Sequence, residues 1–309
     1  MVSIVIPCYN VETYVANTID SILKQTDEDW EIIAIDDGSS DNTFDVLSSY
    51  SQKDSRIRVK RVKNQGVSAA RNIGITFAYG DWIYFLDGDD VIEDGLVAEL
   101  NGRIDKTEML LFDFVKEKRG KVLKKYKIRR LNDILGDFLV NSQTICMCSF
   151  AVKREFINNF NLKFDTDTYY GEDREFIAKI LVNNPQIQYV NRILFRYQLR
   201  SSSAMGQKDY SMKRYSSILA SERTYRFLRG HSSEKKAYLM LVFTIIRHFK
   251  MYCKSKNKDP HVYELLLEYI DKYVKGIRFY GFKRMGLYST LAGIMAYNKI
   301  MMQQFVKIY

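Results

Sequence analysis

The first hundred residues alternate between short apolar runs and amphipathic stretches, and this alternation constrains the fold more than any other feature. The apolar runs predict buried strands at residues 2–7, 31–36, 56–62 and 82–86. The intervening stretches predict helices at residues 11–25, 40–52 and 66–80. Strands that alternate with helices pair in parallel through crossover helices. We therefore predict an α/β fold with a doubly wound parallel sheet.

The rest of the chain is less regular. Strands are expected around a turn at Gly120, and helices are expected at residues 133–141, 150–160 and 172–184. From residue 208 onward the pattern is helical throughout. We predict one domain at residues 1–207, with halves at 1–100 and 101–207, followed by a basic helical region at residues 208–309.

The composition is that of an ordinary soluble globular protein, with 46% hydrophobic and 27% charged residues. The start of the chain lacks the features of a secretory signal. Its longest apolar run, Ala237–Ile246, is shorter than the about 20 residues that cross a bilayer. The four cysteines form no disulfide pattern, so we expect a cytoplasmic protein with free thiols. Cys146 and Cys148 are expected in a buried strand rather than in a metal site.

Polar residues collect directly after the four predicted strands. The segments concerned are Pro7–Asn10, Asp36–Asp41, Lys63–Gly66 and Asp87–Asp90. In an open α/β sheet, ligands bind outside the carboxyl ends of the strands. The sequence therefore predicts a ligand site at this edge of the sheet.

Asp87 and Asp89 carry the strongest chemical signal of that edge. In an extended segment, residues two apart project to the same side, and Gly88 between them would let a ligand approach the backbone. Such carboxylates suit Mg²⁺ or Mn²⁺, bound together with substrate phosphates. Oxygen ligation also agrees with the absence of histidine from the first 230 residues. The alternative is a solvated acidic turn without a ligand.

Arg71 falls in the first two turns of the helix that is predicted to begin near Gly66. A helix amino terminus and an arginine together favour phosphate binding. The glycines form neither a G-x-G-x-x-G motif nor a G-x-x-x-x-G-K-[ST] motif. A dinucleotide fold and a P-loop NTPase are therefore not supported.

Four segments together resemble the family 2 inverting glycosyltransferases. They are "VSIVIPCYNVETYVANTIDSILKQTDEDWEIIAIDDGSSDNT", "NQGVSAARNIGI", "GDWIYFLDGDD" and "YYGEDREFIAKIL". The resemblance covers residues 1–100 closely and residues 145–205 loosely. It implies a Rossmann-like, nucleotide-diphospho-sugar transferase sheet of the GT-A type, followed here by a C-terminal helical extension.

The resemblance also implies which residues would hold the nucleotide sugar. Pro7 and Tyr9 would line the nucleoside pocket, and Asp37 would accept a hydrogen bond from uracil. Asn64 and Arg71 would help to hold the base and the diphosphate. At the acidic segment, Asp87 would face the ribose or the metal, and Asp89 would bind the metal directly. Gly88 stands where the family more usually has Ser or Ala. The glycine could loosen this loop.

For catalysis, the resemblance implies that Asp173 is the general base and that Glu172 orients groups beside it. Asp173 would take the proton of the acceptor hydroxyl while the metal stabilises the departing UDP. Without the resemblance, both acids would be interpreted as first-turn residues that favour the helix dipole. Further along the chain, Arg200 and Ser202 could close over the diphosphate or belong to an ordinary surface loop.

The net charge of +10 is concentrated in two segments. Residues 116–130 contain nine Lys or Arg against one Glu, and residues 231–309 contain fourteen against five acids. The first segment could be a solvated hairpin, a nucleic-acid patch or a membrane-facing edge. With Tyr126 as its one aromatic residue, we expect no nucleic-acid binding. The C-terminal helices could contact an anionic membrane surface or pack on neighbouring helices or a second subunit.

We interpret the chain as a metal-dependent glycosyltransferase that uses Mn²⁺ or Mg²⁺. It would move a sugar from a nucleotide-diphospho-sugar, most simply a UDP-sugar, to a glycan or lipid-linked acceptor in surface polysaccharide biosynthesis. The alternative is a non-catalytic nucleotide-sugar-binding or scaffold protein of the same fold. A phosphoryl-transfer enzyme is not supported, because no P-loop accompanies the acidic cluster.

Overall fold

The computed structural model describes residues 1–103, 107–128, 132–200, 210–257 and 259–274. The chain divides into two compact units, Met1–Gly206 and Gln207–Tyr309. The predicted domain at residues 1–207, its halves at 1–100 and 101–207, and the basic helical region at 208–309 stay predictions.

Four parallel strands form the half of the sheet that begins the chain, as the sequence predicts. They are β1 (Val2–Cys8), β2 (Trp30–Asp36), β3 (Ile57–Arg61) and β4 (Trp82–Phe85), and they lie in the order β3-β2-β1-β4. Both β2 and β4 are buried along their whole length. This burial explains why these strands are continuous apolar runs rather than alternating ones.

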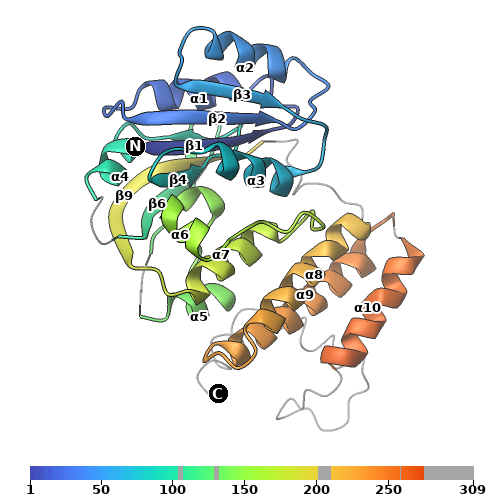
Figure 1. Cartoon of the computed structure of the whole chain (residues 1–309). Helices are drawn as coiled ribbons and strands as arrows, with labels where there is room; N and C mark the ends of the chain where they lie inside the picture. The colour runs from blue at the N-terminus through green and yellow to red at the C-terminus, as the bar shows by residue number, and fades with distance from the viewer. Residues whose placement is uncertain (104–106, 129–131, 201–209, 258, 275–309) are drawn as a thin grey trace. The chain divides into compact units, whose positions relative to one another are not determined.

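Three helices connect these strands: α1 (Val15–Leu23), α2 (Thr43–Ser51) and α3 (Val67–Phe77). Right-handed crossovers place α1 and α2 on one face of the sheet and α3 on the other, where it lies along β1 (Figure 1). A Cβ built on Gly74 would lie 2.2 Å from Val5 Cγ1, so α3 sits unusually close to the sheet. This approach brings the first turns of α3 near the carboxyl ends of β1 and β4.

The remaining strands make the sheet mixed, with nine strands in all. They are β5 (Val91–Ile92), β6 (Met109–Lys118), β7 (Lys121–Tyr126), β8 (Phe150–Lys153) and β9 (Ile187–Gln198). Strand β8 runs antiparallel to both β4 and β6, whereas β6 and β9 are parallel. Helices α4 (Leu96–Asn101), α5 (Ile134–Leu139), α6 (Arg154–Asn159) and α7 (Glu172–Val182) complete this unit.

Two local predictions in this region were wrong. The single helix expected at residues 150–160 is a strand followed by a short helix, because Phe150–Lys153 pair with neighbouring strands on both sides. Cys146 and Cys148 do not lie in a strand, because a 3-10 turn at Met147–Ser149 (η1) interrupts the chain there. All four cysteines are free.

The second unit contains α8 (Met212–Phe227), α9 (Glu234–Lys254) and α10 (Pro260–Tyr273). Their apolar faces share one core, in which Leu241, Ile245 and Leu266 are fully buried. No helix within the described ranges is both long and apolar enough to cross a membrane. Four basic residues of the C-terminal region, for which membrane contact and helix packing are alternative expectations, lie outside the described residues: Lys275, Arg278, Lys283 and Arg284.

Candidate active site

The loops after β1 and β2 form the first wall of the predicted site. The strand order reverses between β1 and β4, which is where open α/β sheets bind ligands. Asn10 adopts a left-handed conformation, and its side-chain oxygen accepts a hydrogen bond from the Ser40 backbone at 2.9 Å. Beside it, Pro7 is half-buried and Tyr9 is 52% exposed. Both predicted nucleoside-pocket residues thus lie at the open mouth of this wall.

Asp37 organises the second wall. Its carboxylate is buried and accepts hydrogen bonds from the backbone N–H groups of Gln65 and Gly66, both at 2.8 Å. These bonds fix the loop that enters α3 and hold Asn64 in an exposed position. Both Asp37 oxygens therefore already have a partner, and a bond to uracil would use a remaining lone pair. Its role toward the base stays a prediction.

Arg71 links two acidic segments that are far apart in the sequence. Its Nη2 donates to Asp87 Oδ1 at 2.9 Å, and its Nη1 lies 3.6 Å from Glu172 Oε1. The Arg71 side chain is buried, whereas Asp87 is 35% exposed. The structure thus joins three residues that the sequence predicts as site residues, one each from α3, the end of β4 and α7.

Glu172 and Asp173 begin α7, after Gly171 in a left-handed conformation. Burial raises the pKa of Glu172 to about 7, the nearby charge of Asp173 adds to this rise, and Arg71 opposes it. Asp173 Oδ1 accepts a hydrogen bond from the backbone of Arg174 at 2.7 Å. The pair therefore places a carboxylate beside a carboxyl group that can gain or lose a proton near neutral pH.

The acidic segment after β4 is a turn, so the predicted extended geometry of Asp87 and Asp89 is wrong. The Asp90 backbone N–H donates to the Asp87 carbonyl at 3.0 Å, which closes a four-residue turn. Asp89 forms an ion pair with Arg200. The guanidinium of Arg200 also lies 4.2 Å from the centre of the Tyr14 ring. Asp87 and Asp89 therefore have separate partners in this state of the site.

Asp90 is a site residue that sequence reasoning missed, although it is the third acid of the same run. Its side chain is buried, and its Oδ1 accepts a hydrogen bond from the Gln198 backbone at 2.7 Å. Its Oδ2 has no hydrogen-bond partner among the described residues. Burial, with the charge of Asp87 beside it, raises the pKa of Asp90 well above its usual range.

A candidate cation position follows from these contacts. Oxygens of Asp87 and Asp90 and the Cys148 sulfur lie within 4.8 Å of one another. Sulfur is a soft ligand, so the Cys148 thiol is a poor ligand for a hard cation. The side-chain oxygens of Asp87 and Asp90 are of the type that Mg²⁺ and Mn²⁺ prefer, and the Asp90 Oδ2 has no hydrogen-bond partner among the described residues. A bound cation would favour the ionised form of Asp90.

Gly88 is packed against protein rather than open to a ligand. A Cβ built there would lie 3.2 Å from Cys8 Sγ and 3.3 Å from Val11 Cγ2. The turn therefore rests directly on the loop that follows β1. Ser202, named with Arg200 in the sequence analysis, lies outside the described residues.

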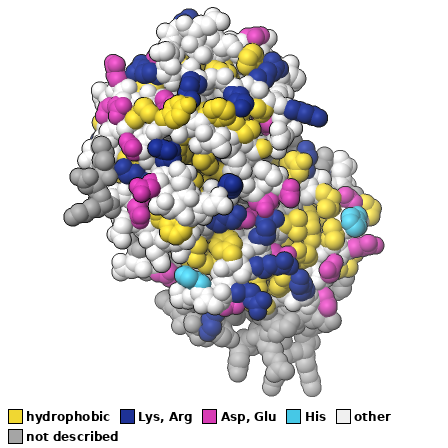
Figure 2. Space-filling model, viewed as in Figure 1, with side chains coloured by type: hydrophobic (Ala, Val, Ile, Leu, Met, Phe, Trp, Pro, Cys, Tyr) yellow, Lys and Arg dark blue, Asp and Glu magenta, His cyan; other side chains and the backbone are white. Residues whose placement is uncertain are grey.

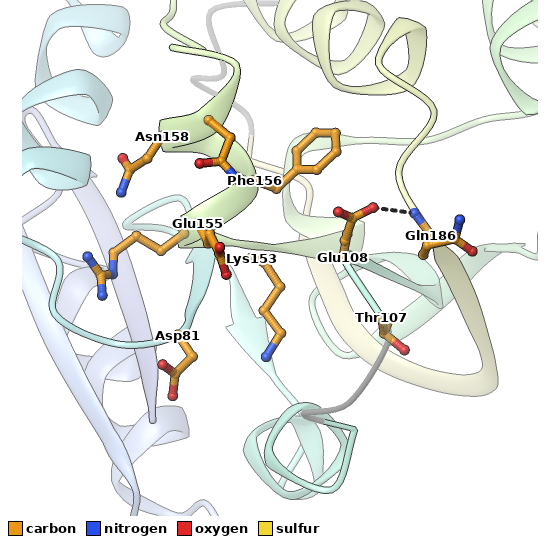
Figure 3. A pocket seen from close by; sticks show the side chains of 10 residues that line it. Asp81, Thr107, Glu108, Lys153, Glu155, Phe156, Asn158 and Gln186 are labelled. Carbon is orange, nitrogen blue, oxygen red and sulfur yellow. Dashed lines mark hydrogen bonds between the residues drawn. The ribbon is translucent and has the colours of Figure 1, made fainter.

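A pocket of the first unit lies elsewhere. It has a volume of about 950 Å³ and is lined by the end of β8, by α6 and by residues that precede β4, β6 and β9, among them Asp81, Glu108 and Gln186 (Figure 3). The Gln186 backbone N–H donates to Glu108 Oε2 at 2.7 Å across part of its wall. These positions mark the amino ends of the parallel strands, so this pocket is separate from the acidic turn.

Comparison with known proteins decides the family. A family model described as "Glycosyl transferase family 2" matches residues 3–168, which is more than half of the 309 residues. The chain belongs to glycosyl transferase family 2. The prediction of a family 2 glycosyltransferase is therefore confirmed.

Several known proteins are similar to this family 2 chain over most of its length. The "Uncharacterized glycosyltransferase EpsJ" of Bacillus subtilis is 29% identical over 214 residues, which cover 66% of this chain and 62% of EpsJ. The Escherichia coli "UDP-Glc:alpha-D-GlcNAc-diphosphoundecaprenol beta-1,3-glucosyltransferase WfgD" is 31% identical over 234 residues, which cover 71% and 85%. The "Minor teichoic acid biosynthesis protein GgaB" of B. subtilis is 28% identical, and the match covers 84% of this chain but 30% of GgaB. The chain thus spans less than two thirds of the length of EpsJ and of GgaB.

Two solved structures share the fold. S. aureus TarS 1-349 in complex with UDP-GlcNAc has a TM-score of 0.69 at 19% identity, covering 90% of this chain and 81% of TarS. The mannosyltransferase PcManGT from Pyrobaculum calidifontis, in complex with GDP-Man and Mn²⁺, has a TM-score of 0.55 at 15% identity, covering 96% and 84%. The predicted α/β sheet of the GT-A type with C-terminal helices is thereby confirmed.

Proposed function

We propose that this glycosyltransferase moves a sugar from a UDP-sugar to a lipid-linked or glycan acceptor during synthesis of a surface polysaccharide. WfgD, the relative that is 31% identical, is named for transfer from UDP-Glc to a diphosphoundecaprenol-linked sugar. GgaB is named for teichoic acid biosynthesis, and TarS was solved with UDP-GlcNAc. These names support the donor and acceptor classes. We further propose a cytoplasmic location with peripheral contact to the membrane that carries the acceptor.

The nucleotide end of the donor would occupy the mouth between the loops after β1 and β2. Pro7 and Tyr9 would pack on the nucleoside, and Asp37 and Asn64 would contact the base. The support for this placement is the fixed loop geometry, since Asp37 holds the backbone of Gln65 and Gly66 at 2.8 Å. A preformed pocket lowers the entropy cost of binding.

A divalent cation is proposed at the acidic turn, with Mn²⁺ or Mg²⁺ held by Asp87 and Asp89 together with the donor phosphates. When bound, such a cation neutralises the negative charge that develops on the departing UDP. The unpartnered oxygen of Asp90 offers a further ligand next to Asp87. Arg200 would release Asp89 and bind the diphosphate instead, because a guanidinium binds both carboxylates and phosphates.

Asp173 is proposed as the general base. The acceptor hydroxyl would give its proton to the Asp173 carboxylate as its oxygen bonds to the anomeric carbon. The bond from that carbon to the phosphate oxygen breaks at the same time, and its electron pair leaves with UDP. Attack opposite to the leaving group inverts the anomeric centre. Glu172, with a pKa of about 7, would hydrogen-bond and orient the acceptor beside the base.

The observation that carries this proposal is the contact of Arg71 with both Asp87 and Glu172. Arg71 thereby contacts one of the two proposed cation residues and the residue next to the proposed base, which supports a single site. The test is hydrolysis of a panel of UDP-sugars with MnCl₂ or with EDTA, together with calorimetric binding of UDP. Turnover with MnCl₂ that EDTA removes is expected. Binding without turnover of any donor would favour the non-catalytic alternative.

A further inference from the structure

Strand β7 and the end of β6 form a hairpin that stands out from the sheet. We call residues 116–127 the basic hairpin. Within the described residues, β7 pairs with β6 alone, and Lys121–Lys125 are all exposed. The turn residues Arg119 and Gly120 have φ values of 51° and 75°, which suits the tight turns that connect twisted strands. The tip of the hairpin, residues 118–125, is therefore exposed, whereas Lys116 and Glu117 at its base pair with β9 in the sheet.

The charge of the basic hairpin is almost entirely of one sign. Its cations are Lys116, Lys118, Arg119, Lys121, Lys124, Lys125 and Lys127. Its one acid, Glu117, is buried and accepts a hydrogen bond from Arg196 at 2.8 Å. None of the seven cations forms an ion pair with another described residue. On the face of the molecule in Figure 2, by contrast, basic and acidic side chains are interspersed.

The pairing of the two strands places like charges opposite each other. Lys118 faces Lys121, and Lys116 faces Lys124, across the antiparallel ladder. Like charges directly opposite each other destabilise a pair of strands. One opposite charge in each pair would remove the repulsion, yet lysine stands at all four positions. An anionic surface on the outside of the hairpin would remove it as well.

Two apolar residues are exposed among these lysines. Val122 is 39% exposed and Leu123 is 52% exposed. Leu123 is the extra residue of a bulge, because Glu117 faces Val122 and Lys116 faces Lys124. Exposed apolar side chains between lysines are typical of segments that enter the interface of a bilayer. A soluble polyanion would match the charge of the hairpin but would leave these two side chains in water.

The base of the hairpin is joined to the candidate active site. The Glu117 carbonyl accepts from the Leu199 backbone at 2.8 Å, and its carboxylate accepts from the Gln198 side chain at 2.7 Å. The Gln198 backbone in turn donates to Asp90 in the acidic turn at 2.7 Å. We propose that the basic hairpin docks on an anionic phospholipid surface and thereby presents the site to a lipid-linked acceptor. The acceptor in this inference rests on the proposed function, whereas the docking itself does not.

The test is sedimentation of the full chain with phosphatidylcholine vesicles that contain or lack phosphatidylglycerol. The hairpin variant is K118Q/K121Q/K124Q/K125Q. Its matched control is K24Q/K53Q/K60Q/K163Q, which removes the same charge from exposed lysines elsewhere. We expect the hairpin variant to lose at least about tenfold in affinity for anionic vesicles, and the control to lose less than about twofold. The hairpin variant should keep its melting temperature, because it removes like-charge pairs.

A second variant, V122S/L123S, separates insertion from charge. We expect it to weaken binding most at high salt, where electrostatic attraction is screened. Equal binding of anionic vesicles by the parent and the hairpin variant would overturn the inference, as would failure of the parent to bind them. Capture of soluble polyphosphate without vesicle binding would instead identify a polymer partner and also overturn it. Calorimetric UDP binding, measured separately, tests the donor site, so failure of the proposed function is distinguishable.

Discussion

Arg71 donates from its Nη2 to Asp87 Oδ1 at 2.9 Å, and this bond connects α3 to the acidic turn after β4. The same guanidinium lies near Glu172 at the start of α7. The candidate site is therefore held by one buried cation that three segments share. Removing this cation would leave two carboxylates at the sheet edge without their partner.

Arg71→Met should consequently destabilise the protein. Breaking a buried ion pair costs about 3 kcal/mol, and partial exposure of Asp87 lowers the expected loss to about 2 kcal/mol. Urea unfolding measures it. The control is Arg103→Met, which breaks an i,i+4 pair with Glu99 on the surface and should cost less than about 1 kcal/mol. Equal losses in the two variants would contradict a central role of Arg71.

Asp173→Asn should separate binding from catalysis. The amide keeps the size of the side chain but cannot accept the acceptor proton. We expect UDP affinity to stay within about threefold and turnover to fall by at least about 100-fold. Asp167→Asn, at an exposed position shortly before α7, is the control and should keep full turnover. Normal turnover of Asp173→Asn would show that another group is the base.

Glu172→Gln should raise stability at alkaline pH. Burial raises the folded pKa of Glu172 to about 7, above its ordinary value of 4.5, so the folded state binds the extra proton between these values. Stability from this group is full below pH 4.5 and is lost as the pH rises through 7. The amide mimics the protonated form. In metal-free buffer, the variant should melt several degrees higher than the parent at pH 8 and at the same temperature at pH 4.5. A melting temperature of Glu172→Gln that exceeds the parent's at pH 4.5 but not at pH 8 would contradict a raised pKa of Glu172.

His248 should make the second unit sensitive to acid. It is buried between the Tyr210 hydroxyl and Ser217 Oγ. Burial lowers its pKa from 6.5 to about 3, and the charges of Arg247 and Arg214 add to this change. The folded pKa is depressed, so stability is present above pH 6.5 and is lost as the pH falls toward 3.

The change to measure is the difference between the parent and His248→Gln. Relative to this neutral variant, the parent should lose about 2 kcal/mol of unfolding free energy between pH 7 and pH 5. Gln can still accept from Tyr210 and donate to Ser217. His261→Gln, at an exposed position, should show the pH dependence of the parent. Identical slopes for the parent and His248→Gln would mean that the pKa of His248 is the same in the folded and unfolded states.

Sequence patterns predicted the elements that are long, periodic and buried. Strands β1, β2 and β4 are continuous apolar runs because helices cover both faces of the sheet, and their order along the chain also fixes the ligand edge. The four-residue strand β8 was missed, because Phe150–Lys153 run directly into α6 without a turn signal. Its identity depends on pairing with β4 and β6, which local sequence does not carry.

The site was predictable by residue type but not by partner. The acids after β4 are visible in the sequence, yet the turn that separates Asp87 from Asp89 forms only where β4 ends. The buried Asp90 accepts a hydrogen bond from the Gln198 backbone, and the partner of Asp89 is Arg200. Gln198 ends β9 and Arg200 follows it, far along the chain from the acidic turn, so no local pattern could assign these partners.

The most direct test of the account is a crystal soaked with UDP and MnCl₂. The account predicts an anomalous manganese peak at the turn Asp87–Asp90, bridging the UDP phosphates, with Arg200 moved from Asp89 to the diphosphate. A manganese peak or a UDP molecule elsewhere, for example in the pocket beside Asp81 and Glu108, would contradict it.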